Sequence, residues 1–127
     1  MSNVQRLDRL ASAAGAADAL DLKKLKEVED LLGEAATGRM LERLAADVAS
    51  RLTDAALQAE RLEVASTVHA LASATGLLGF SALSGACAAL ERACRLDQPT
   101  DAATADLRAE RDRALSLLGA RATAAAA

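Results

Sequence analysis

Hydrophobic residues recur three or four positions apart along most of this 127-residue chain, the spacing of helices with one buried face. Ser2 and Gln5 have the spacing of a capping box and predict a short first helix. Asp21 is placed to cap a second helix, which Gly33 ends. One face of this second helix is shared by Leu22, Leu25, Val28 and Leu32.

The same spacing predicts four more helical segments, beginning with a third helix over residues 35–57. A fourth helix starts near Glu60, and the sequence GLLGFS ends it, with Leu78 and Gly79 forming the turn and Gly79 suited to a left-handed cap. The next helix buries Leu83, Cys87, Leu90 and Cys94. Pro99 closes that helix, and Thr100 can cap the last one, in which Arg111 falls on the buried side and must extend its charge to solvent.

The predicted fold class is all-α, because Ala and Leu dominate, Pro occurs once and aromatic residues make up 1% of the chain. Short connections between amphipathic helices favour an up-and-down antiparallel four-helix bundle with one or two additional N-terminal helices. We expect residues 1–20 to form an N-terminal helix or extension and residues 21–119 to form the bundle. Residues 120–127 are expected to be a disordered tail.

Charge and composition argue against several classes of partner. A net charge of −3 with one Phe and no Trp or Tyr offers neither a basic track for nucleic acid nor a surface for base stacking. Residues 64–90 carry no Lys, Arg, Asp or Glu, yet their Ser, Thr, Gly and His content argues against a membrane span. Cys87 and Cys94 lie about 10.5 Å apart along a helix, too far for a disulfide. The expected location is the cytoplasm, since no signal peptide is visible.

The only histidine, His69, lies outside the buried stripe of the fourth helix. At 100° per residue it projects about 140° from Val64, so its imidazole is expected to face outward. A lone histidine on a helix can be an ordinary surface residue. Small neighbours favour access by something bulky instead, and we interpret them as a docking surface: Ala65, Ser66, Ala72, Ser73 and Gly76.

At these positions the chain resembles the histidine-containing phosphotransfer (HPt) domains of multistep two-component phosphorelays. Those domains share the pattern HxLKG, then LG nine and ten residues after the His, then a Leu and a downstream LE. Here the matching residues are His69, Leu71, Leu78-Gly79, Leu83 and Leu90-Glu91. The resemblance covers roughly residues 20–119.

The resemblance implies that His69 accepts a phosphoryl group from the aspartyl phosphate of one receiver domain and passes it to another. The partners would be receiver domains of response regulators or of hybrid histidine kinases. The chain would need no cofactor or metal of its own, because the receiver supplies Mg²⁺ and acidic residues. A carrier of this type has no kinase activity of its own and normally works as a monomer, although pattern alone leaves a dimer open.

Two positions depart from the family pattern. The usual Lys three residues after the His is Ala72, and the usual Gly four residues after it is Ser73. Loss of the Lys should weaken retention of phosphate, unless a cation elsewhere takes over; Lys23, Lys24, Arg39 and Arg43 are candidates. Ser73 could bond to its own helix or donate to a phosphoryl oxygen.

The sequence is compatible with two other functions. The chain could be a regulatory module that docks a receiver or a kinase without carrying phosphate, as the substitution at Ala72 suggests. A stand-alone enzyme has less support, because a single His without an adjacent nucleophile or metal cluster gives little to build on.

Overall fold

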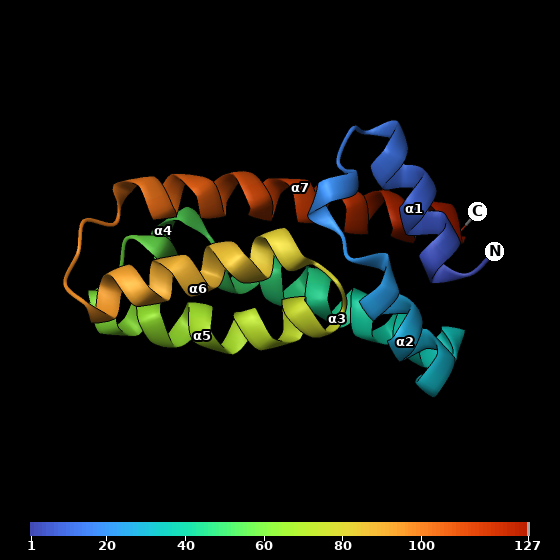
Figure 1. Cartoon of the computed structure of the whole chain (residues 1–127), viewed down its shortest axis with the longest axis horizontal. Coiled ribbons are helices and arrows are strands. Elements are labelled where there is room, and N and C mark those ends of the chain that lie inside the picture. The colour runs from blue at the N-terminus through green and yellow to red at the C-terminus, as the bar shows by residue number, and fades with distance from the viewer. Residues whose placement is uncertain (127) are drawn as a thin grey trace.

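The computed structural model describes residues 1–126, and these residues form α-helices with short connections (Figure 1). No helix within this range is long and apolar enough to cross a membrane. The elements are α1 (Asn3–Ala13), the 3₁₀ turn η1 (Ala17–Ala19), α2 (Leu22–Leu32), α3 (Glu34–Arg51), α4 (Asp54–Leu57), α5 (Arg61–Leu77), α6 (Ser81–Arg95) and α7 (Asp101–Ala126).

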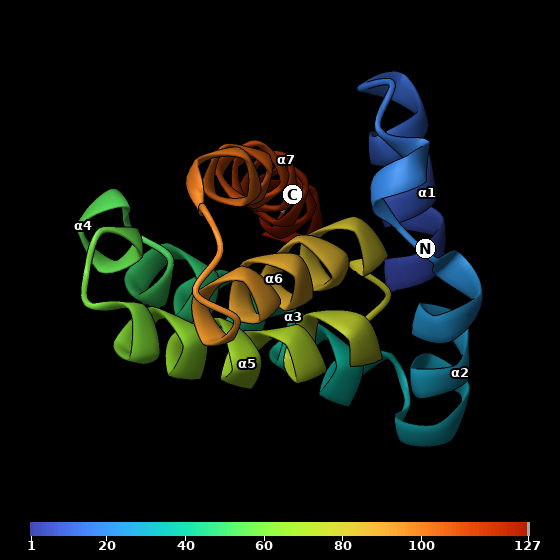
Figure 2. The same cartoon turned by 60° about the vertical axis from the view of Figure 1, so that its left-hand side comes forward.

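Four of these helices, α3, α5, α6 and α7, run up and down beside one another as a four-helix bundle (Figure 1). Figure 2 shows α7 nearly end-on above α6, with α1 and α2 stacked against one end of the bundle. The core between the helices is almost entirely aliphatic. The all-α class and the bundle with two additional N-terminal helices are therefore confirmed.

The helix ends near the N-terminus follow the local sequence. Ser2 accepts a hydrogen bond from the Gln5 amide while the Gln5 side chain accepts one from the Ser2 amide, which completes the capping box. Asp21 caps α2 through the Lys24 amide, and Gly33 follows the last residue of α2 with φ +87°. These three predictions are confirmed.

The long third helix expected over residues 35–57 is not continuous: the expectation is wrong after residue 51. It stops at Arg51, and after Leu52 the hydroxyl of Thr53 caps the separate short helix α4. The guanidinium of Arg111 donates to the carbonyl of Leu52 at 2.9 Å and to the carboxylate of Asp54 at 2.8 Å. Arg111 thus leaves the core, but its side chain is 14% exposed, and its charge is paired with Asp54 instead of being extended to solvent. Its two contacts hold the break between α3 and α4 in place.

The prediction of a disordered tail from residue 120 is wrong for residues 120–126, which continue α7 as helix; Ala127 lies outside the described residues. The reason is Arg121, which is 5% exposed. Its guanidinium donates twice to the side-chain oxygen of Asn3, at 2.8 and 3.1 Å. Asn3 in turn donates to the carboxylate of Glu29 at 2.8 Å. This polar cluster joins the end of α7 to α1 and α2.

The turn between α5 and α6 has the form that its sequence predicts. Leu78 is buried, and Gly79 has a φ of +86°, a backbone conformation that glycine adopts without strain. The carbonyl of Gly79 accepts a hydrogen bond from the amide of Asp21 at 2.6 Å. A side chain at this position would overlap the carbonyl oxygen of Asp21. Glycine is therefore required both by the turn and by its contact with the start of α2.

Candidate functional site

His69 lies in the middle of α5 and points out of the bundle. Its side chain is 67% exposed, while Val68 and Leu71 on either side of it are buried in the core. The helical period therefore separates the imidazole from the core, as the sequence predicts. An exposed ring on a packed helix can be reached by a partner without any change in the bundle.

The ring of His69 is held by a carboxylate from the neighbouring helix α6. Nδ1 of His69 lies 3.0 Å from Oε1 of Glu91. A hydrogen bond from Arg95 lowers the pKa of Glu91, and the contact with His69 lowers it further. Glu91 is therefore ionised near neutral pH and can only accept a hydrogen bond, so Nδ1 of a neutral imidazole must carry the proton. The lone pair of the ring then resides on Nε2, on the side of the ring away from Glu91.

Arg95 completes this arrangement from one turn further along α6. Its Nε donates to Oε2 of Glu91 at 2.8 Å, and its side chain is 47% exposed. The two oxygens of one carboxylate thus bind a guanidinium and an imidazole at the same time. This row of three side chains was missed in the sequence, although the Leu90-Glu91 pair and the four-residue spacing to Arg95 were both visible.

The small residues near His69 do not form one outer surface. Ala65 is completely buried, so its assignment to a docking surface is wrong. Ala72 and Gly76 are half-buried against α6, where the hydroxyl of Ser84 donates to the carbonyl of Ala72 at 2.8 Å. A Cβ on Gly76 would lie 3.0 Å from that hydroxyl oxygen. These small side chains therefore let α5 and α6 pack closely, because there is no room for larger ones.

Ser66 and Ser73 are exposed, as their assignment to the docking surface requires. They share the outward side of α5 with His69 and with one leucine at each end of the helix. These leucines, Leu62 and Leu77, are 59% and 56% exposed. The exposed face of α5 consequently carries an imidazole, small side chains and two large apolar ones, with a single charge at Glu63.

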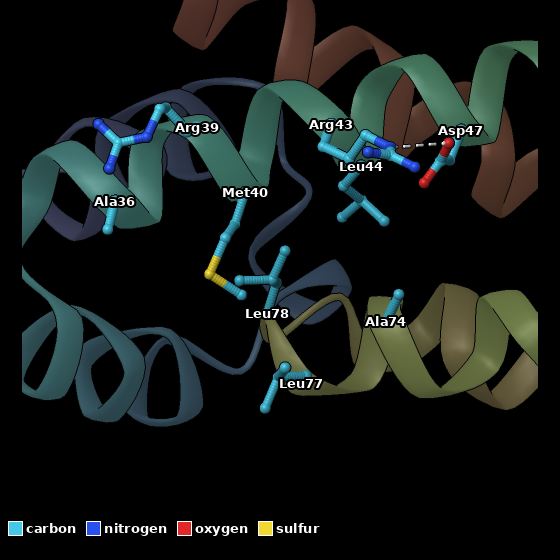
Figure 3. A pocket seen from close by; sticks show the side chains of 9 residues that line it. All are labelled: Ala36, Arg39, Met40, Arg43, Leu44, Asp47, Ala74, Leu77 and Leu78. Atoms are coloured by element: carbon cyan, nitrogen blue, oxygen red, sulfur yellow. Dashed lines mark hydrogen bonds and ion pairs between the residues drawn. The ribbon is translucent and has the colours of Figure 1, made fainter.

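A groove of about 430 Å³ separates the second half of α5 from α3 (Figure 3). Met40 of α3 and Leu78 at the end of α5 point toward one another across its floor. Arg39 and Arg43 line its α3 side, and Arg43 makes a 3.4 Å contact with Asp47. The groove therefore combines an apolar floor with a basic rim.

Of the four cationic side chains that are candidates to replace the missing Lys, three lie along the second half of α5. Arg39 and Arg43 line the groove just described, and Lys24 of α2 lines a second hollow with Leu77. Lys23 is exposed and lines neither. These side chains flank the region after His69, whereas Arg95 is the cation linked to the imidazole by a shared carboxylate.

The two thiols of this helix pair are buried. Both cysteines are free and lie in the core, and burial raises the pKa of Cys87 to about 12. A thiol in such surroundings stays protonated and inaccessible. Unlike these thiols, the imidazole of His69 is exposed to a partner.

The sequence model of the Hpt domain matches residues 39–123, about two-thirds of the chain. No curated protein and no solved structure gives a significant match. The chain belongs to the Hpt domain family, whose members perform histidine phosphotransfer in phosphorelays and interact there with receiver domains. The matched range begins within α3 and leaves α1 and α2 outside it.

Proposed function

We propose that this chain is a phosphorelay carrier that accepts a phosphoryl group on Nε2 of His69 from the aspartyl phosphate of a receiver domain and passes it to another receiver domain. The observation that carries this proposal is the exposed imidazole with Nδ1 held by ionised Glu91. That contact fixes both the ring orientation and the tautomer, so the reactive lone pair points to solvent.

The transfer step needs no base in this chain. The Nε2 lone pair forms the N–P bond as the bond between phosphorus and the aspartyl oxygen breaks, and the receiver's carboxylate leaves with the electron pair. The ring keeps its Nδ1 proton and becomes a positively charged phosphoimidazolium, which the Glu91 carboxylate stabilises at 3.0 Å. Transfer to the next receiver reverses these changes. In this proposal the receiver supplies the Mg²⁺ and the acidic residues that phosphoryl transfer requires.

The surface around His69 supports docking of a receiver. A protein interface of ordinary size buries about 800 Å² on each partner, equivalent to a disc of about 16 Å radius. Leu77 borders the groove and lies eight residues beyond His69, about 12 Å along the helix axis, so the groove begins near the edge of a disc centred on His69. Its apolar floor can bury a partner's apolar side chains, while Arg39 and Arg43 favour an acidic partner such as a receiver's aspartate-rich face.

The absence of the family's usual lysine at Ala72 favours one alternative, a module that docks a receiver or a kinase without carrying phosphate. Such a module would bind its partner equally well with and without the imidazole. In either case we infer a cytoplasmic location, which fits the two free cysteines in the core. A monomer is sufficient for the proposed transfer, because the groups described above come from one chain.

The direct test is transfer from a panel of phosphorylated receiver domains to the native chain, to His69→Ala and to His69→Gln. We expect acid-labile, base-stable phosphate on the native chain alone, with circular dichroism showing that both variants remain helical. His69→Gln keeps a side-chain N–H that can donate to Glu91, so it serves as the matched control for the contact. Phosphate on either variant would overturn the assignment to His69. Binding of a receiver without transfer would favour the docking module.

A further inference from the structure

A phosphoryl group on His69 places new negative charge on a part of α5 that has no cation of its own. The group carries about −1.5 to −2 charges near neutral pH. The positions three and four residues after the imidazole are Ala72 and Ser73, and neither side chain can offset that charge with a cation. Either the phosphorylated state is left uncompensated, or another element supplies the positive charge.

The structure contains a cation joined to His69 through a single carboxylate. Oε1 of Glu91 contacts Nδ1 of His69 at 3.0 Å, and Oε2 of the same group contacts Nε of Arg95 at 2.8 Å. Since the two oxygens of a carboxylate are roughly 2.2 Å apart, Arg95 Nε lies within about 8 Å of the ring. That separation does not exceed the Debye length at physiological ionic strength, so the two groups still interact.

We propose that Arg95 is the residue that compensates the charge of phosphorylated His69, in place of the lysine that the chain lacks at position 72; this inference rests on the proposed function. Phosphorylation makes the ring positive, and the ring then neutralises part of the negative charge of Glu91. The carboxylate of Glu91 then attracts the guanidinium of Arg95 less strongly. Its exposed Nη groups can turn toward the phosphoryl oxygens while the side chain stays beside Glu91.

The direction of approach differs from that of a lysine on α5. The two helices form an antiparallel hairpin, so moving from Glu91 to Arg95 along α6 moves toward the start of α5 (Figure 1). Arg95 therefore reaches His69 from its N-terminal side, whereas position 72 lies on its C-terminal side. The side of the phosphoryl group that faces position 73 stays open to a receiver.

The two arginines of the groove and the neighbouring Arg92 fit the role less well. Arg39 and Arg43 line the groove beside Ala74 and Leu77, one to two turns past the imidazole, and Arg43 already contacts Asp47. Arg92 belongs to the last turn of α6, like Arg95, and is exposed. It follows Glu91 directly and so projects about 100° away from it around the helix. Arg92 is therefore a matched control with the same charge, the same helix and a different direction.

The test is a ³¹P NMR titration of phosphorylated His69 in the native chain and in Arg95→Ala, Arg95→Lys and Arg92→Ala. Phosphoramidate serves as the donor, so the measurement does not depend on finding the natural receiver. A nearby cation lowers the pKa of the phosphoryl group because it favours the dianion. We expect this pKa to rise by roughly 0.2 to 0.5 in Arg95→Ala at low salt, and the difference to shrink at 1 M salt.

Two controls make the result specific. Arg95→Lys should keep most of the native value, because it keeps the charge, and Arg92→Ala should leave the value unchanged. Equal phosphoryl pKa values in the native chain and Arg95→Ala, or an equal rise in Arg92→Ala, would overturn this inference and leave the proposed function intact. If neither phosphoramidate nor any receiver phosphorylates His69, the proposed function fails and this inference fails with it.

Discussion

Asp21 and Gly79 are joined backbone to backbone: the amide of Asp21 donates to the carbonyl of Gly79 at 2.6 Å. The contact attaches the start of α2 to the turn between the two helices that carry His69 and Glu91. It requires a left-handed conformation and the absence of a side chain at position 79. The position of the helix pair relative to α2 thus depends on Gly79, a residue without a reactive side chain.

Gly79→Ala should therefore destabilise the chain strongly. The left-handed backbone costs an L-residue about 1–2 kcal/mol, and displacement of the Asp21 carbonyl adds to this. We expect a loss of about 2–3 kcal/mol in the free energy of unfolding, measured by urea denaturation. Gly85→Ala is the control, because Gly85 is helical with no neighbour within 4 Å of a new Cβ. That variant should gain about 0.5–1 kcal/mol; equal losses in both would contradict the argument.

Substitutions of Glu91 can separate its two proposed effects on transfer, which are to orient the ring of His69 and to supply a negative charge. Glu91→Gln keeps an oxygen that can accept from Nδ1 of His69, but it loses the charge that stabilises the phosphoimidazolium. Glu91→Ala loses both. We expect initial rates of phosphoryl acceptance to fall about threefold in the first variant and about tenfold or more in the second. Acceptance by Glu91→Ala at the native rate would show that the contact has no part in transfer.

Much of this fold could be predicted because the determinants are local. The spacing of hydrophobic residues gives the helices, and the caps at Ser2, Asp21 and Gly33 mark their ends without help from the rest of the chain. The exposed direction of His69 follows from the same periodicity. The break after Arg51 was missed because Leu52 continues the hydrophobic stripe. The Thr53 cap is a local signal against that stripe, and the Arg111 contacts reinforce it only once α7 is in place.

The site was harder to predict because its parts come from different helices. The sequence places small residues near His69, but a single-helix projection does not show which side α6 covers. Ala65 was therefore assigned to a surface when it is buried between helices. The contacts of Glu91 with His69 and of Asn3 with Arg121 join residues 22 and 118 positions apart. Their partners become visible only when the bundle is assembled.

Asp54 should contribute to stability in a pH-dependent way. A hydrogen bond from Arg111 is the main cause that lowers the pKa of this carboxyl, with a smaller contribution from Arg108. A folded-state pKa below the unfolded value means that the contribution is complete above about pH 3.9 and is lost as pH falls through the lower folded value. The difference in unfolding midpoint between the native chain and Asp54→Asn should be constant from pH 8 to 5 and shrink below pH 4. A constant difference down to pH 2 would exclude this linkage.

Cys87 should be unreactive while the bundle is folded. Its pKa of about 12 leaves roughly one thiolate in ten thousand molecules at pH 8, and its side chain is buried. In a Cys94→Ala variant, where Cys87 is the only thiol, we expect iodoacetamide to label the chain in urea but not in buffer. Labelling in buffer at a rate close to that in urea would mean that α6 opens readily.

The contact of Asn3 with Arg121 predicts that one substitution can lower the stability of the fold without changing phosphoryl transfer. Asn3→Ala leaves the buried guanidinium without its two short hydrogen bonds, and the 3.9 Å approach to Glu42 is too long to replace them. We expect the free energy of unfolding to fall by about 2–3 kcal/mol, with phosphate acceptance at 10 °C unchanged, because α1 does not contribute to the surface around His69.

The double variant Asn3→Ala/Arg121→Met tests the physical cause of that loss. It removes the buried charge together with its acceptor, so part of the lost stability should return. A double variant less stable than Asn3→Ala would show that Arg121 contributes through its contact with Gly38 or Glu42 instead. A fall in phosphate acceptance by folded Asn3→Ala would mean that the N-terminal helices, which lie outside the matched Hpt range, take part in the function of the bundle.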